Sequence, residues 1–365
     1  MRILIYTGAL VAGGVESLLL NTISEADKKL YQFDIMTYNN SENDWAYKFE
    51  ELGCHIYYMQ NPGKLGYLKS ILACRKFFKQ GNYDIIHSQI GFTSILPLIA
   101  NASLRKPKAL FICHSHFDNY PFSKVTKTFL RLLFKIIPCK KLACSNGAGY
   151  ELYGQKADFT WLKNGIDTER FSYNEQIRQE VRKELGISND EFVIGTVGRM
   201  CYQKNHEFLV KIFDKIVEQH ANSRLLLIGD GELRNDIQSQ IRRLNLENKV
   251  LFLGKRNDVN RLLQSFDVFI MPTRFEGLSL ALLEVQCSGL PCLTSDQVPP
   301  EAKILSNFEM LSLEEGESYW AERALSYFHK ERKNGVTLVE KAGFDKKTAA
   351  KMWLGVYDEI MNKKR

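Results

Sequence analysis

The chain of 365 residues lacks several features that define other classes of protein. Its eight cysteines form no C-x-x-C pair and no cysteine-histidine spacing of the zinc type, which favours reduced thiols in a cytosolic protein. The first residues lack the apolar core and cleavage site of a signal peptide. Residues 85–104, the longest stretch of the first half without Asp, Glu, Lys or Arg, contain His87 and Asn101 and are too polar to span a membrane. We therefore expect neither export by the general route nor a transmembrane segment.

An even charge distribution is also lacking. Residues 1–170 contain 21 Lys and Arg against 14 Asp and Glu, whereas the remaining residues contain 28 against 28, so the formal charge of +7 belongs to the first half. Such asymmetry indicates an anionic partner for that half: nucleic acid, an acidic polymer or an anionic membrane. The hydrophobic fraction of 45% and the charged fraction of 25% are those of an ordinary folded protein.

Short apolar runs alternate with helical periods along the whole chain, which predicts parallel strands joined by right-handed crossovers. We predict strands at 3–6, 33–37, 56–59, 85–87, 109–113, 141–144, 160–162, 192–197, 224–228, 250–253, 268–271 and 291–294, and helices at 16–24, 65–78, 122–137, 148–153, 206–218, 233–244, 258–266 and 280–287. The Asn-Gly turn at 164–167 separates two doubly wound α/β domains, residues 1–166 and 167–345. A last helix within 346–365 is expected to cross back to the first domain. Ligands of such sheets bind beyond the carboxyl ends of the strands, so we expect a site where the two domains face each other across a cleft.

Two glutamates, Glu276 and Glu284, follow the strand at 268–271 with seven residues between them. A helix that begins near Leu278 or Ser279 would direct free N–H groups at a phosphate. One carboxylate before the phosphate and one beyond it could then bind hydroxyls at both ends of a nucleotide-sugar. The alternative is a helix with an acidic start and one solvated glutamate.

Arg199 and Lys204 follow the strand at 192–197. A guanidinium fork and a mobile ammonium together could neutralise a diphosphate leaving group. The chain contains no Asp-x-Asp triplet, the usual means by which a nucleotide-sugar enzyme holds a divalent cation, so these cations could replace a metal ion. The alternative is a pair of surface cations at a helix start.

Two groups in the first half follow strands as well. Gly13-Gly14 opens a helix and leaves room for a ligand to approach the backbone, or is a glycine turn without a ligand; it is not the G-x-G-x-x-G of a dinucleotide site. His114 and His116 follow the strand at 109–113, and His116 is the better placed to meet a substrate, although a single histidine is more often structural.

The segment 122–142 contains no acidic residue. Lys124, Lys127, Arg131 and Lys135 recur at helical spacing among apolar residues, which favours a helix on an anionic membrane surface. The alternative is a core helix with a solvated basic face. Nucleic acid is a weaker candidate because no binding motif accompanies the charge.

In their order and spacing, these residues resemble a retaining glycosyltransferase of family 4 with the GT-B fold. The resemblance rests on Gly13-Gly14, the Asn-Gly turn at 164–167, Arg199 with Lys204-Asn205, and the pair Glu276 and Glu284. The run 289–301 is similar to the bacterial branch that builds capsular and exopolysaccharides.

The resemblance implies a role for each matching residue. Arg199 and Lys204 would hold the donor diphosphate, Glu284 the ribose hydroxyls and Glu276 the transferred sugar, while the backbone of Gly277, Leu278 and Ser279 would meet the β-phosphate. His116 would face the sugar near the reacting carbon, Gly14 would line the phosphate or acceptor side, and Arg256 is a weaker candidate for the uracil.

The resemblance further implies transfer from a UDP-sugar to a lipid-linked oligosaccharide on the cytoplasmic face of the cell membrane, with no cofactor and no divalent metal. Retention would arise by attack from the face of the leaving group, or with Glu276 as a covalent nucleophile. The alternatives are a UDP-sugar epimerase of the same fold, a non-catalytic subunit that anchors a polysaccharide assembly at the membrane and, last, a nicotinamide dehydrogenase.

Overall fold

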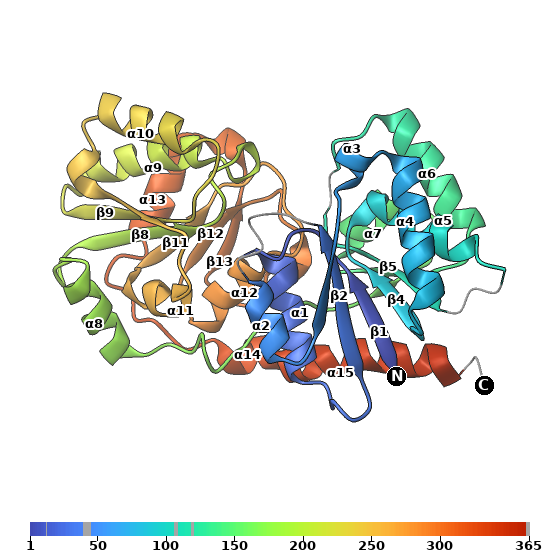
Figure 1. The fold of residues 1–365 in the computed structure, drawn as a ribbon. Helices are drawn as coiled ribbons and strands as arrows, with labels where there is room; N and C mark the ends of the chain where they lie inside the picture. Colours follow the sequence, from blue (N-terminus) through green and yellow to red (C-terminus); the bar gives the residue numbers. More distant parts are fainter. Residues whose placement is uncertain (12, 39–44, 106–108, 118–119, 363–365) are drawn as a thin grey trace. The chain divides into compact units, whose positions relative to one another are not determined.

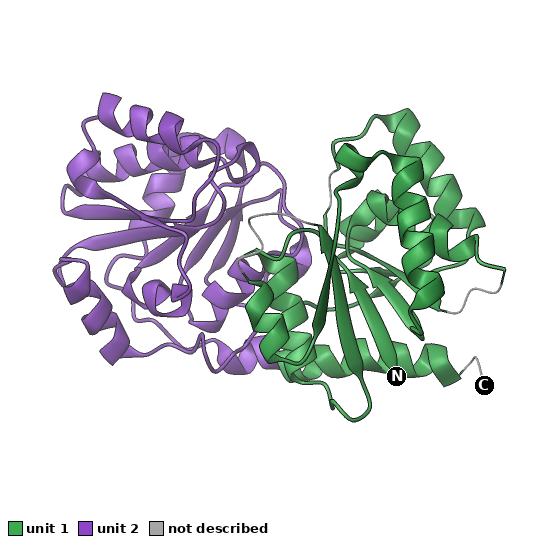
Figure 2. Cartoon of the chain, viewed as in Figure 1, with its two compact units in different colours: residues 1–165, 346–365 green, residues 166–345 purple. Residues whose placement is uncertain are grey.

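The computed structural model describes residues 1–365 except 12, 39–44, 106–108, 118–119 and 363–365. The chain forms two compact units (Figure 2): unit 1 comprises Met1–Gly165 and Lys346–Arg365, and unit 2 comprises Ile166–Asp345. Ile166 was assigned to the first domain from the sequence, but it begins unit 2 because its N–H donates to the Phe344 carbonyl 2.8 Å away and it forms a β-bridge with Asp345.

Unit 1 is built on a seven-stranded sheet with the order β3-β2-β1-β4-β5-β6-β7, all pairs parallel (Figure 1). The strands are β1 Arg2–Tyr6, β2 Gln32–Tyr38, β3 His55–Met59, β4 Ile85–Ser88, β5 Leu110–Ser115, β6 Lys140–Ala143 and β7 Thr160–Trp161. The helices are α1 Gly14–Ser24, α2 Ala46–Glu51, α3 Pro62–Leu65, α4 Tyr67–Gln80, α5 Ile95–Ala102, α6 Lys124–Ile136, α7 Asn146–Tyr153 and α15 Lys346–Asn362. Helices α4, α5, α6 and α7 pack in succession on one face of the sheet, and α15 packs with α1 on the other.

Unit 2 repeats the plan with six parallel strands in the order β10-β9-β8-β11-β12-β13. The strands are β8 Phe192–Val197, β9 Ser223–Ile228, β10 Val250–Gly254, β11 Val268–Met271, β12 Cys292–Ser295 and β13 Phe308–Leu311. The helices are α8 Glu175–Glu184, α9 His206–Gln219, α10 Arg234–Arg243, α11 Val259–Leu262, α12 Leu280–Cys287, α13 Gly316–Leu325 and α14 Val336–Lys341. Helices α9, α10 and α13 cover one face (Figure 1), and their apolar residues form the largest part of the core of this unit.

The doubly wound α/β class is confirmed in both units, and every strand expected from the sequence is present. Strand β13 was missed because only two of its four residues are buried, too short a pattern to detect. Helix α5 was missed because Pro97 lies in it; a proline is tolerated in a first turn, whose N–H groups have no partner within the helix. In α13 only Trp320, Ala321 and Ala324 are buried, which makes a narrow apolar stripe.

None of the helices in the described part of the chain combines the length and hydrophobicity that a membrane-spanning helix requires.

Candidate functional site

Each sheet has one point at which the strand order reverses, and parallel sheets bind ligands beyond the carboxyl ends of the strands at that point. In unit 1 the reversal lies between β1 and β4, and in unit 2 between β8 and β11. In each unit, ligand-binding and catalytic residues are therefore expected in the loops that follow these strands.

In unit 2, Lys204 and Glu276 form an ion pair at this point. Lys204 comes from the turn Tyr202–Lys204 after β8, and Glu276 from the loop after β11. Their side chains are only 15% and 12% exposed, and the Lys204 ammonium also lies 3.6 Å from the Met271 sulfur. A Cβ on Gly198 would lie 3.3 Å from the Lys204 side chain, so the glycine leaves room for it. The structure thus brings together two residues that the sequence separates by 72 positions.

Hydrogen bonds hold these two loops against each other. The Gln203 carbonyl accepts from the Thr273 hydroxyl at 2.9 Å and from the Arg274 N–H at 2.8 Å, and the Gln203 side chain donates to the Phe275 carbonyl at 3.1 Å. The Thr273 carbonyl in turn accepts from Ser295 at 2.5 Å. Glu276 therefore projects from a loop whose backbone is fixed on both sides.

Arg199 lies in the same loop as Lys204 but is solvent-exposed. Its guanidinium forms an ion pair with Glu232 at 3.1 Å, with side chains 73% and 54% exposed. Sequence analysis missed Glu232 and the Gly229-Asp230-Gly231 turn that carries it. Gly229 has φ +130°, and a Cβ there would lie 2.0 Å from the Gly198 carbonyl oxygen, so only glycine lets the turns after β8 and β9 approach so closely. Two glycines in a turn after a strand were the signal that could have revealed it.

Helix α12 begins at Leu280, with Ser279 as its N-cap residue, within two residues of the expected start. The Ser279 side chain forms no capping hydrogen bond, so it does not occupy the first N–H groups of the helix. Leu278 is buried in the core and Gly277 is half-buried. This end of α12 therefore offers backbone donors rather than side-chain donors to an anion.

Glu284 lies one turn into α12 and is half-buried. Burial raises the pKa of its carboxyl to about 7, and the positive charge of Arg170 opposes that rise only in part. Arg256, after β10, is held by Asp258 through two hydrogen bonds of 2.8 and 2.7 Å, and this acceptor raises its pKa. The guanidinium of Arg256 is thus already paired with a carboxylate.

In unit 1, Gly14 is the first residue of α1, exposed and with open space around the position of a Cβ. Gly13 is different, because a Cβ there would lie 2.5 Å from a carboxylate oxygen of Glu16. Sequence analysis missed Glu16, which is 8% exposed and whose pKa burial raises to about 7. Its carboxyl turns back towards the helix start, so a side chain at position 13 would collide with it.

The rings of three histidines lie in succession in unit 1, near the carboxyl ends of β4 and β5. The rings of His87 and His114 lie 5.4 Å apart and those of His114 and His116 lie 4.2 Å apart. His87 and His114 are fully buried, and burial lowers the pKa of His116 to about 3. Nε2 of His116 lies 2.5 Å from Oε1 of Gln89, a residue that sequence analysis did not single out. His116 is therefore a neutral imidazole whose ring position is fixed.

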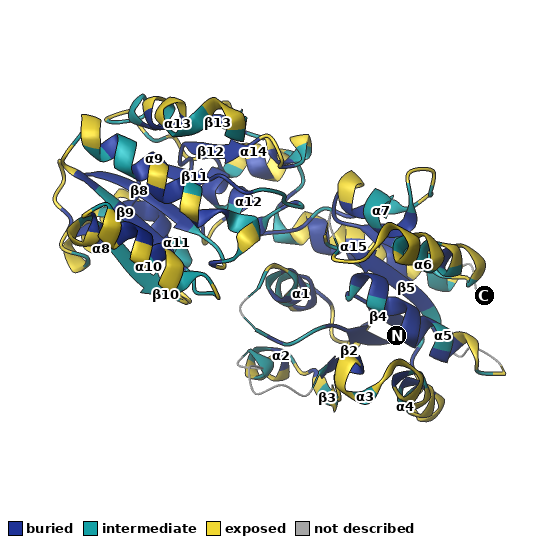
Figure 3. Ribbon diagram, turned by 90° about the horizontal axis from the view of Figure 1, so that it is seen from above, coloured by how far each residue is buried: buried dark blue, intermediate teal, exposed yellow. Residues whose placement is uncertain are grey.

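Two of the four basic residues of α6 form ion pairs with α7. Lys127 lies 2.5 Å from the Glu151 carboxylate, and Arg131 lies 3.2 Å from that carboxylate and 2.6 Å from the Glu151 carbonyl, so both turn towards α7. Of the four cations expected at a membrane surface, Lys127 and Arg131 are therefore paired with Glu151, whereas Lys124 and Lys135 are exposed. Much of α6 is exposed (Figure 3), and its exposed large hydrophobic residues form an apolar stripe of Val125, Phe129, Leu132 and Ile136, with Phe122 just before the helix.

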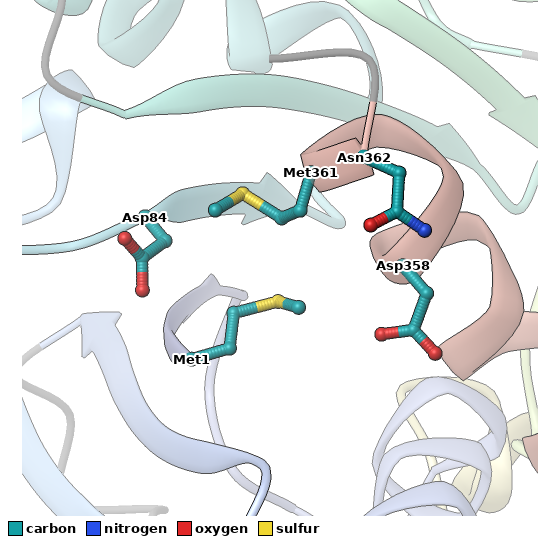
Figure 4. Close-up of a pocket in the computed structure, with 5 residues that line it drawn as sticks. All are labelled: Met1, Asp84, Asp358, Met361 and Asn362. Carbon is teal, nitrogen blue, oxygen red and sulfur yellow. The ribbon is translucent and has the colours of Figure 1, made fainter. Parts of the chain in front are cut away.

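A pocket of about 430 Å³ lies in unit 1 between Met1, Asp84 and the end of α15, where it is lined by Asp358, Met361 and Asn362 (Figure 4). Met1 and Asp84 directly precede β1 and β4, so this pocket opens at the amino ends of the strands, opposite the edge that carries His116. No group of three or more His, Cys, Asp and Glu suited to a metal ion occurs in the part of the chain that the structure describes.

Comparisons with known proteins bear on both units. A family described as "Glycosyltransferase Family 4" matches residues 12–170, and one described as "Glycosyl transferases group 1" matches residues 177–337. The putative glycosyltransferase EpsF of Bacillus subtilis is 32% identical, across 98% of this chain and 96% of the relative.

A second relative is the UDP-Gal:alpha-D-GlcNAc-diphosphoundecaprenol alpha-1,3-galactosyltransferase of Escherichia coli, which is 31% identical over 63% of this chain and 62% of its own length. Among solved structures, Anabaena HepE in complex with UDP and glucose matches with a TM-score of 0.80 and 18% identity, across 98% of this chain and 99% of HepE. At that identity the likeness concerns the fold.

Proposed function

Since the chain belongs to the family 4 glycosyltransferases and has their GT-B fold, we propose that it moves a sugar from a UDP-sugar to a lipid-linked saccharide with retention of configuration, in capsular or exopolysaccharide synthesis. The observation that carries the proposal is the ion pair of Lys204 and Glu276 at the strand reversal of unit 2, with Arg199 in the same loop. Two comparisons support the donor and acceptor classes: HepE binds UDP, and the Escherichia coli relative is named for UDP-Gal and a diphosphoundecaprenol acceptor.

The donor diphosphate would take Lys204 and Arg199 as its cationic partners. Both cations are paired with carboxylates in the free protein, so a diphosphate would displace Glu276 from Lys204 and Glu232 from Arg199. The released Glu276 would accept hydrogen bonds from the hydroxyls of the transferred sugar, and Glu284 from those of the ribose. The backbone N–H groups at the start of α12, after Gly277, Leu278 and Ser279, would meet the β-phosphate.

The reaction would break the bond between the anomeric carbon and the donor phosphate, and negative charge would grow on the departing UDP. Fixed donors aimed at developing charge usually lower the barrier of such a reaction more than any other group does. Lys204, Arg199 and the start of α12 supply these donors in unit 2. No divalent cation is needed in this scheme, because side chains and backbone provide the positive charge.

The acceptor side would belong to unit 1, which carries the excess of positive charge. The apolar stripe of α6, with Lys124 and Lys135 exposed beside it, has the composition of an interfacial helix that lies on an anionic lipid surface. We infer that unit 1 docks on the cytoplasmic face of the membrane through this stripe, where a lipid-linked acceptor is available.

The experiment that tests the function measures nucleotide release from UDP-glucose, UDP-galactose, their N-acetyl forms and GDP-mannose, with and without a diphosphoundecaprenol-linked acceptor. We expect release from one UDP-sugar, dependent on the acceptor, and a loss of about 100-fold or more in Glu276→Gln and Lys204→Met. Lys215→Met is the matched control, because Lys215 forms an exposed pair with Glu218 on α9.

Other outcomes would identify the alternatives. Conversion of the donor to an epimer without an acceptor would identify an epimerase of the same fold. If no nucleotide were released and UDP failed to bind in calorimetry, the transferase proposal would be wrong and a non-catalytic anchoring subunit would take its place.

A further inference from the structure

Gln89 and His116 contact each other from neighbouring strands of unit 1. Gln89 directly follows β4 and is 3% exposed, and its backbone N–H donates to the Tyr6 carbonyl at the end of β1 at 2.8 Å. Its Oε1 lies 2.5 Å from Nε2 of His116, which directly follows β5. Because the backbone of Gln89 is tied to β1, its side chain reaches His116 from a fixed base.

The chemistry of the contact determines which ring nitrogen carries the proton. An amide oxygen only accepts hydrogen bonds, so in this orientation Nε2 of His116 must donate. A neutral imidazole has a single N–H, and burial keeps this ring neutral by lowering its pKa. The lone pair is then on Nδ1, for which no hydrogen-bond partner is found among the described residues.

The plane of the ring is held as well. The ring centroids of His116 and His114 lie 4.2 Å apart, and that of His114 lies 5.4 Å from the His87 centroid and 5.0 Å from the Trp353 centroid. His87 is anchored by a 2.7 Å hydrogen bond between its Nδ1 and the Tyr357 hydroxyl of α15. These neighbouring rings restrain rotation of the His116 ring, and Gln89 supplies the contact to its Nε2.

We propose that Gln89 is a positioning residue that fixes the Nε2–H tautomer of His116, so that Nδ1 serves as a hydrogen-bond acceptor for a sugar hydroxyl of the substrate. The substrate part of this inference rests on the proposed glycosyl transfer. The tautomer part rests on the contact of the two side chains and is tested without substrate.

The first test is a long-range ¹H–¹⁵N NMR spectrum of the full chain with ¹⁵N-labelled histidine, assigned with His116→Gln. We expect a pyridine-type Nδ1 and a protonated Nε2 for His116 in the wild type. Gln89→Leu should yield a mixture of tautomers, and Gln89→Glu, whose carboxylate also only accepts, should restore the Nε2–H form. A protonated Nδ1 in the wild type, or an unchanged tautomer in Gln89→Leu, would overturn the proposal.

The second test is kinetic. Gln89→Leu should lower kcat about 10- to 100-fold and leave the KM for the donor within about 2-fold, and Gln89→Glu should recover part of the loss. Asn101→Leu is the matched control: it removes another buried side-chain amide of unit 1, which donates to the Ala109 carbonyl at 3.0 Å, and should leave both the tautomer and kcat unchanged. A kcat for Gln89→Leu equal to that of Asn101→Leu would refute the catalytic part. Lack of turnover with every donor in the wild type would refute the proposed function instead, and the NMR result would stand.

Discussion

Removal of both partners of the Lys204–Glu276 pair should destabilise unit 2 by less than the sum of the two single removals. At about 3 Å and an effective dielectric constant of about 20, the attraction between two unit charges is about 5 kcal/mol. The side chains are 15% and 12% exposed, so most of this attraction offsets the cost of desolvating two charges. We therefore expect a net coupling of about 1–3 kcal/mol, and a loss of about 2–3 kcal/mol when either charge is left without its partner.

The assay is a double-mutant cycle in urea with the wild type, Lys204→Met, Glu276→Leu and the double variant. The double variant should be more stable than the sum of the single effects predicts. The exposed pair of Lys215 and Glu218 is the control, since its side chains are 38% and 55% exposed and a surface pair couples by less than about 1 kcal/mol. Additive effects within about 0.5 kcal/mol at Lys204 and Glu276 would refute the reasoning, and so would equal coupling in the two pairs.

Three further predictions concern charge, pH and lipid. Glu232→Gln should tighten UDP binding about 2- to 5-fold in calorimetry, because it releases Arg199 from an exposed pair that contributes about 0–1 kcal/mol; unchanged or weaker binding would contradict this. Burial raises the pKa of Glu284 from 4.5 to about 7, so the folded chain binds this proton more tightly than the unfolded chain does. The contribution of this group to the free energy of unfolding is therefore complete below about pH 4.5 and is lost as the pH rises through 7. The wild type should therefore lose about 2–3 kcal/mol more between pH 5 and 8 than Glu284→Gln in urea denaturation, and equal losses would exclude the raised pKa. Phe129→Gln with Leu132→Gln should weaken sedimentation with anionic vesicles by about 100-fold or more and leave UDP binding intact, since each exposed side chain contributes about 1.5–3 kcal/mol when it enters lipid; unchanged sedimentation would rule out this docking surface.

The fold class was predictable from the sequence because it depends on periodicity. Strands such as β1 and β8 are short apolar runs that are buried along nearly their whole length, and a parallel sheet covered on both faces requires such runs. Hydrophobic periodicity did not reveal β13 and α13, because few of their residues are buried in the core. Periodicity does not reveal side-chain partners: Glu151 lies 20 residues from Arg131, and no local pattern indicates that it pairs with Lys127 and Arg131.

The sequence allowed most residues of the candidate site to be selected, but it did not indicate which of them form ion pairs with each other. Lys204 and Glu276 each follow a strand, and the rule that ligands bind at the carboxyl ends of parallel strands was enough to select both. Their contact depends on β8 and β11 being neighbours, a fact of strand order that the sequence does not state. Glu232 was missed for the same reason, because it follows β9, whose place beside β8 brings it to Arg199.

Strand order also explains why Gln89 escaped sequence analysis while His116 did not. Histidine attracts attention as a residue type, whereas a glutamine after a strand has no chemistry until its partner is known. Strands β4 and β5 are adjacent and parallel, with Ser88 paired to Cys113, so residues one to three positions beyond these pairs meet at one edge. An amide there is the described group that contacts a nitrogen of His116, and the proton that it places on Nε2 leaves Nδ1 as the acceptor. The residue that carries the chemistry and the residue that sets its protonation thus come from different strands, and only the register of the sheet connects them.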